Sequence, residues 1–201
     1  MVLMSTAFAY LIGIPMGIIL NITSPVGIRP NRVINIIVGF ITNIIRSIPF
    51  LILLVAILPF TRAIVGTTIG STATVVPLVV AAAPFVARMV ESSLKEVDTG
   101  VIEAAKAMGS STWQIIWKVL LVEARPSLLI GGLIAFATIL GYSAMAGFVG
   151  GGGLGAIAVN YGYYRYDTEV MLVTVAILVI IVQVVQELGT HIVTRTDKRI
   201  N

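Results

Sequence analysis

Residues 170–186 read VMLVTVAILVIIVQVVQ, an apolar segment without a charged side chain. A helix needs about 20 mostly apolar residues to cross the hydrocarbon core of a bilayer. The same bias extends over all 201 residues, of which 58% are hydrophobic and 11% charged, against about half and about a quarter in soluble domains. The sequence therefore predicts an all-α integral membrane protein and leaves no room for a sizeable soluble catalytic domain.

Apolar runs separated by charges, prolines and glycines predict about five transmembrane helices within one domain that spans residues 1–201. The expected ranges are 2–22, 34–58, 72–90, 127–147 and 170–192. No Lys or Arg precedes Arg29, so the chain lacks the basic start of a cleavable signal peptide. We therefore expect the first range to be a retained span. The one long polar stretch, 91–125, is expected to lie in water.

Basic side chains gather on one side of these five spans. Two basic residues, Arg62 and Arg165, are expected on one side, and Arg46 lies inside a span. The other side has ten: Arg29, Arg32, Arg88, Lys95, Lys106, Lys118, Arg125, Arg195, Lys198 and Arg199. Cytoplasmic loops carry the excess of Lys and Arg. The pattern predicts a cytoplasmic 91–125 loop, a cytoplasmic C-terminus and an N-terminus outside. The basic residues are scattered singly and without interleaved aromatics, which argues against nucleic-acid binding.

Several kinds of chemistry are disfavoured by what the chain lacks. It has no cysteine and one histidine, His191, so we expect no metal site and no thiolate chemistry. A membrane enzyme is disfavoured because no nucleophile and base form a convincing pair. A stand-alone secondary transporter is disfavoured by the shortage of acidic residues within the spans. No G-x-x-x-x-G-K-[ST] motif is present, so hydrolysis of ATP by that route would need another polypeptide.

The 91–125 stretch predicts two short helices. The first, Glu103–Gly109, ends at a glycine that can close its last turn in a left-handed conformation. The second begins near residues 110–112, whose hydroxyls suit an N-cap. Its apolar face comprises Ile116, Val119 and Leu120, with Trp113 one turn earlier. We expect this face to meet lipid headgroups or another protein. Neither helix is long enough to be stable alone in water, so each needs a docking surface.

The spacing of this loop resembles that of a known family. Glu103-Ala104-Ala105, three residues, Gly109, nine residues and Val119-Leu120-Leu121 are similar to E-A-A-x3-G-x9-I-x-L-P, the loop of the permease subunits of bacterial ATP-binding-cassette (ABC) importers. Val119 stands for the usual Ile and Val122 for the usual Pro. The resemblance implies a type I importer permease fold in the bacterial inner membrane, with the 91–125 stretch as the cytoplasmic coupling-helix loop.

The same resemblance implies partners and a division of labour. Two copies of the permease would form the pathway, two cytoplasmic ATP-binding subunits would hold ATP and Mg, and an extracytoplasmic protein would deliver the substrate. This chain would then be non-catalytic and bind no cofactor itself. The residues implied in coupling to the ATPase subunits are Glu103, Ala104, Ala105, Met108, Gly109 and Trp113.

Further motifs resemble the methionine importer permease over about residues 13–195. They include Arg46-Ser47-Ile48-Pro49-Phe50, Ala83-Pro84-Phe85-Val86-Ala87-Arg88 and Gly151-Gly152-Gly153-Leu154-Gly155. Polar amino-acid permeases usually show R-G-T-P where this chain has R-S-I-P. The resemblance implies methionine as the substrate, with another amino acid or small solute as the alternative. Family members commonly carry a short segment before the first span, so a clipped outer end is expected here.

Three further groups of residues are candidates for the transport pathway. Arg46 is an ionisable residue within a span, which favours a functional role, although snorkelling or bonding to carbonyls near Pro49 would also explain it. Met145 is a candidate gate, with ordinary helix packing as the alternative. The candidate external loop is formed by Gly150, Gly151, Gly152 and Gly153, which would look similar as a generic turn.

Overall fold

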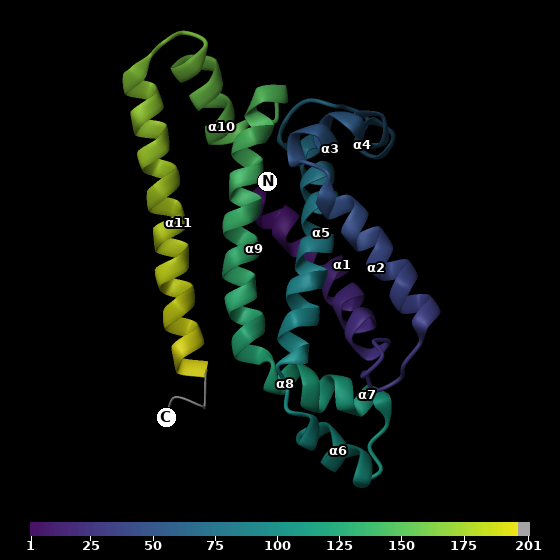
Figure 1. The fold of residues 1–201 in the computed structure, drawn as a ribbon. Coiled ribbons are helices and arrows are strands. Elements are labelled where there is room, and N and C mark those ends of the chain that lie inside the picture. The colour runs from purple at the N-terminus through teal and green to yellow at the C-terminus, as the bar shows by residue number, and fades with distance from the viewer. Residues whose placement is uncertain (197–201) are drawn as a thin grey trace.

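The computed structural model describes residues 1–196, and within this range the chain is helical with no strand (Figure 1). The long helices are α1 (Val2–Ile22), α2 (Arg32–Ser47), α5 (Ser71–Lys95), α9 (Arg125–Met145) and α11 (Thr168–Thr196). They alternate in direction, and the end of α11 lies at the same end of the molecule as the segment between α5 and α9 (Figure 1). The predicted all-α architecture is confirmed.

Short helices cap both ends of this bundle. The end opposite the segment between α5 and α9 is named the outer end after the predicted orientation. It carries α3 (Phe50–Ala56), α4 (Leu58–Val65), η2 (Ala146–Val149), α10 (Gly153–Ile157) and η3 (Ala158–Tyr163). The other end carries α6 (Thr99–Ala107), α7 (Thr112–Ile115), η1 (Ile116–Leu120) and α8 (Leu121–Glu123). The last three run end to end as one helical segment across the ends of α1 and α5 (Figure 1).

The expected helix over 34–58 is wrong as a single helix. Within residues 1–196, four helices are long and apolar enough to cross a membrane, and α2 with α3 makes a fifth only as a pair bent by 103°. Pro49 is the cause, because it lacks an N–H and excludes the helical conformation at the residue before it. Ile48 is accordingly extended, at φ −85° and ψ 124°. Helices do occupy the other four expected ranges.

The centre of the fold is the close packing of α1 against α5. A Cβ atom placed on Gly17 would lie 2.6 Å from the Ala87 carbonyl oxygen and 2.6 Å from the Val90 Cβ. A Cβ on Gly13, one turn earlier, would lie 2.7 Å from the Val86 Cβ. Small residues at a membrane helix interface allow backbones to approach in this way. The two glycines therefore set the distance between α1 and α5.

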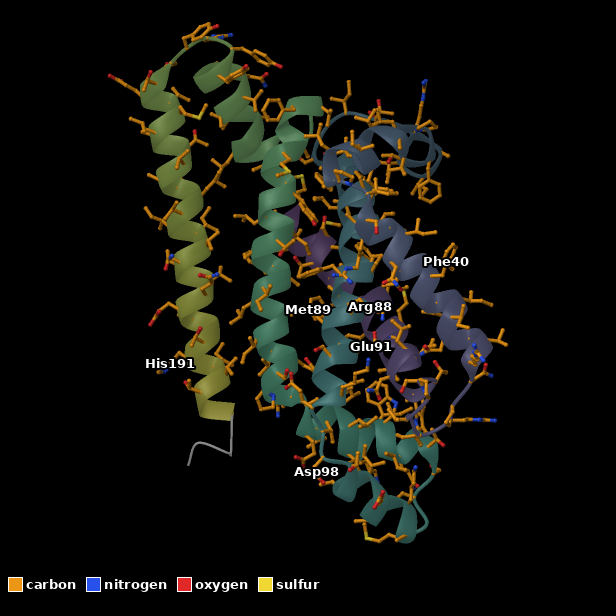
Figure 2. The ribbon with its side chains drawn as sticks, viewed as in Figure 1. Phe40, Arg88, Met89, Glu91, Asp98 and His191 are labelled. Atoms are coloured by element: carbon orange, nitrogen blue, oxygen red, sulfur yellow. The ribbon has the colours of Figure 1, made fainter. Side chains whose placement is uncertain are left out.

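Helix α2 has the opposite polarity from a helix in water. Its exposed face is apolar, and Phe40 points away from the bundle (Figure 2). Its inner face is polar: the Asn35 side-chain amide donates to the Leu20 carbonyl at 2.8 Å and to the Thr23 hydroxyl oxygen at 3.1 Å. Polar side chains of this kind hydrogen-bond across the interfaces of membrane helices. An apolar exterior around polar contacts is the arrangement expected in a bilayer.

The α1–α5 packing predicts the effect of one added methyl group. Gly17→Ala should lower the free energy of unfolding by about 1–3 kcal/mol, because overpacking forces the two helices apart. The matched control is Gly141→Ala, where an added Cβ meets nothing within 4 Å. Thermal unfolding of the detergent-purified protein measures both. Equal melting temperatures in the two variants would contradict the packing constraint.

Candidate functional site

The helix of the Glu-Ala-Ala motif, α6, is closed at both ends. Asp98 caps its start, with the Gly100 N–H donating to the Asp98 Oδ1 at 2.7 Å. At its end Gly109 adopts φ +78°. The Gly109 N–H then donates to the Lys106 carbonyl at 2.9 Å, and the Ser110 N–H to the Ala105 carbonyl at 3.1 Å. These two bonds form the Schellman motif that a left-handed glycine allows, and the predicted glycine stop is confirmed.

The second helical segment begins where its hydroxyls predicted. Ser111 is the N-cap: the Gln114 N–H donates to the Ser111 Oγ at 3.3 Å, and the Ser111 N–H to the Gln114 Oε1 at 2.8 Å. This reciprocal pair is a capping box, which satisfies two helix-end donors at once. The turn between α6 and α7 is therefore fixed by local hydrogen bonds on both sides.

The apolar face of this second segment packs against the core of its own chain. Our expectation that this face meets lipid or another protein is therefore wrong for Ile116, Val119 and Leu120. Ile116 and Leu120 are buried in the core, and Val119 packs against it. The physical reason is that the chain's own apolar core, which includes Leu94 and Val97, offers the docking surface that a short helix needs. Trp113 does lie on the exposed side, with its ring centroid 5.4 Å from that of the also exposed Trp117.

The exposed surface of α6 gathers most of the expected coupling residues. Glu103, Ala104, Met108 and Gly109 are exposed, whereas Ala105 is buried in the core. Met108 is 79% exposed, which is unusual for a side chain of its size and polarity. Together these residues form a small, rigidly held surface at the end of the molecule opposite α3 and α10.

The candidate pathway residues lie at the ends of two different helices. Arg46 is in the last turn of α2, is exposed, and makes no hydrogen bond or ion pair with the described residues, including the carbonyls near Pro49. Met145 is the last residue of α9 and is 46% exposed. Both lie toward the outer end of the bundle, but no interaction joins them within residues 1–196.

The glycine run forms a packed turn at the outer end. Gly150, Gly152 and Gly153 have φ values of +79°, +75° and +74°. Residues other than glycine rarely adopt this region of backbone conformation. The Gly150 carbonyl accepts from the Gly70 N–H at 2.9 Å, and the Gly151 carbonyl from the Thr74 hydroxyl at 3.3 Å. The turn is thus bound to the first residues of α5.

A charged cluster that links α5 to α2 was missed by sequence reasoning. The cytoplasmic placement of Arg88 stays a prediction, but α5 continues to Lys95, so Arg88 lies about two turns before the end of the helix. Its Nη1 lies 2.6 Å from the Glu91 Oε2, and the Lys95 Nζ lies 2.7 Å from the Glu91 Oε1. The i, i+3 and i, i+4 spacings are the signal that was available.

The same arginine reaches across to α2. The Arg88 Nη2 donates to the Asn43 Oδ1 at 2.8 Å and to the Gly39 carbonyl at 3.3 Å. Figure 2 shows Arg88 and Glu91 on the side of α5 that faces α1 and α2. This network holds α2 to the centre of the bundle. No three His, Asp or Glu side chains in the described part of the chain gather closely enough to hold a metal ion.

The chain belongs to the family of binding-protein-dependent transport system inner membrane components, whose model matches residues 13–200. The predicted ABC importer permease family is therefore confirmed. The chain is 51% identical over 199 residues to the probable D-methionine transport system permease protein MetI of Vibrio cholerae, covering 99% of this chain and 88% of that protein. It is 47% identical to the protein of the same name from Pasteurella multocida, covering 97% and 90%.

The fold agrees with that of a solved relative. A chain of the MetNI methionine ABC transporter in an inward-facing conformation superimposes with a TM-score of 0.96 at 49% identity. The match covers 98% of this chain and 91% of that chain. The type I importer permease fold expected from the loop motif is thus confirmed.

The charged cluster predicts a non-additive response to mutation. Glu91→Leu should destabilise the protein by up to about 3–5 kcal/mol, because Arg88 loses the carboxylate that neutralises it. Adding Arg88→Met should recover part of this loss, since the unpaired charge is then removed. A double-mutant cycle by thermal unfolding in detergent measures the coupling. Strictly additive effects would show that the two side chains do not interact.

Proposed function

We propose that two copies of this chain form the membrane pathway of an ATP-driven methionine importer in the bacterial inner membrane. The single observation that carries the proposal is the similarity to the MetNI permease chain over almost the whole length, at a TM-score of 0.96 and 49% identity. The relatives from Vibrio cholerae and Pasteurella multocida, both named for D-methionine transport, support the same substrate.

The coupling surface of this permease is the exposed side of α6 and the start of α7. Glu103, Ala104, Met108 and Gly109 contact a separate cytoplasmic ATPase subunit, Trp113 extends that contact, and Ala105 anchors α6 to its own core. The hydrogen-bonded caps at both ends of α6 support this role, because a helix that transmits movement between subunits must not unwind. ATP and Mg are held by the ATPase subunits, and this chain binds no cofactor and catalyses no reaction.

The transport cycle follows from movement of two such loops. Closure of the ATPase dimer draws the loops together and tilts the spans, which opens the pathway outward, and ATP hydrolysis resets it inward. An extracytoplasmic binding protein delivers methionine at the outer end, where the Gly150–Gly153 turn shapes the surface. Arg46 and Met145 line the route. A stand-alone secondary transporter remains the alternative, which uptake without the ATPase subunit would favour.

The coupling role predicts the behaviour of two variants. Glu103→Lys reverses the charge of the contact, and Gly109→Asp places a side chain at φ +78°, so both should weaken ATPase binding and reduce uptake at least tenfold. Membrane insertion should be unchanged. Co-purification with the ATPase subunit and methionine uptake into proteoliposomes measure these effects.

The matched control is Glu123→Lys, which makes the same charge change on an exposed glutamate outside α6. It should retain both ATPase binding and uptake. Normal ATP-coupled uptake in Glu103→Lys and Gly109→Asp would reject a coupling role for α6.

The proposed orientation places α6 in the cytoplasm, the C-terminus inside and the N-terminus outside. The chain has no cysteine, so single cysteines can be introduced without background. A membrane-impermeant maleimide added to intact spheroplasts should label Tyr164→Cys and leave Glu96→Cys unlabelled until the membrane is opened. The reverse pattern would overturn the orientation.

A further inference from the structure

A cavity of about 160 Å³ lies beside α6 and shares one residue, Glu103, with the exposed surface assigned to the ATPase contact. Its walls come from three places: the turn between α1 and α2, the end of α5, and α6. A single water molecule needs only about 10–15 Å³ measured in this way. The cavity therefore has room for a small organic molecule.

Two buried polar side chains line this cavity without a partner. Asn21 is 9% exposed and Ser24 is 7% exposed. Neither side chain makes a hydrogen bond to any residue in the described range. Their polar atoms are accessible to water from the cavity and are therefore free to bond a ligand. A ligand with hydrogen-bonding groups would take the place of water at these atoms.

The charged groups at the rim define the ligand further. Glu103 and Lys106 lie one turn apart on α6, and neither forms an ion pair with the described residues. Lys95 also lines the cavity, but its ammonium group is bound to Glu91. An unpaired carboxylate beside an unpaired ammonium group is complementary to a ligand that carries both signs of charge.

Apart from Thr99, the remaining lining is apolar and includes Val97 and Ile102. Val97 is 5% exposed, so this part of the wall favours carbon rather than a charged group. We propose that the cavity binds a small zwitterion, with its carboxylate or phosphate beside Lys106 and its ammonium group beside Glu103. Two sources share this chemistry: a free amino acid with an apolar side chain, and the phosphoethanolamine headgroup of a lipid. The site does not depend on the proposed transport function.

The test is equilibrium binding to the purified full-length permease, without the ATPase subunits that would cover Glu103, in nanodiscs of phosphatidylglycerol alone. The two probes are L-methionine and phosphoethanolamine, titrated separately. Ser24→Leu fills the cavity, and Lys106→Gln removes its positive charge. Each should weaken binding at least tenfold. The matched controls are Ser92→Leu and Lys118→Gln, exposed positions that do not line the cavity, and they should bind as the unmodified chain does.

The pattern of binding decides between the sources and can reject the site. Saturable binding of L-methionine alone identifies the free amino acid, and binding of phosphoethanolamine alone identifies the lipid headgroup. No saturable binding of either probe, or binding equally strong in all four variants, would overturn the proposal. Lys106→Gln retains the side-chain length, so its result stands even if Ser24→Leu fails to fold. Uptake assays are separate, and their failure with binding intact would reject only the transport function.

Discussion

The close approach of α1 to α5 is the constraint on which the rest of the structure depends. Gly13 and Gly17 bring the α1 backbone against Ala87 and Val90, where any larger residue would hold the helices apart. Helix α5 in turn contacts α2, α4 and α9. In a bilayer the hydrophobic effect does not drive helices together, because lipid chains are as apolar as the side chains. Shape and hydrogen bonding therefore decide which helices meet.

The polar contacts of the bundle act in that same setting. Asn35 ties α2 to the end of α1, and Arg88 ties α2 to α5. At the end that carries α6, local caps replace such long-range ties: Asp98, Gly109 and Ser111 fix two short helices that could not persist alone in water. A few polar contacts therefore hold the bundle together, and α6 and α7 are fixed at one end of it by their own caps.

Much of this arrangement was predictable from particular residues. The uncharged run at 170–186 predicted a long apolar helix, Gly109 predicted the end of α6, and the hydroxyls before Trp113 predicted the start of α7. The break at Pro49 was harder, because membrane helices tolerate proline, as Pro77 and Pro84 inside α5 demonstrate. The extended backbone at Ile48 distinguishes the two cases, and the presence of a proline alone does not predict it.

The candidate site was predicted less completely for a related reason. Spacing identified α6 and its glycine, but it did not reveal that Ile116 and Leu120 would find their apolar partners within the same chain. Periodicity shows that a helix has an apolar face and not what covers that face. The Arg88 cluster was missed because the length of α5 beyond the apolar run, up to Lys95, is not set by hydropathy.

The inward polar stripe of α2 has a consequence for the order of biogenesis. Asn43 and the Gly39 carbonyl are bonded by Arg88, which is synthesised 45 and 49 residues later. Until α5 is synthesised, the Asn43 side-chain oxygen and the Gly39 carbonyl lack the bonds from Arg88. The hydrogen bonds that fix α2 to α5 therefore form only after the later part of the polypeptide has been synthesised.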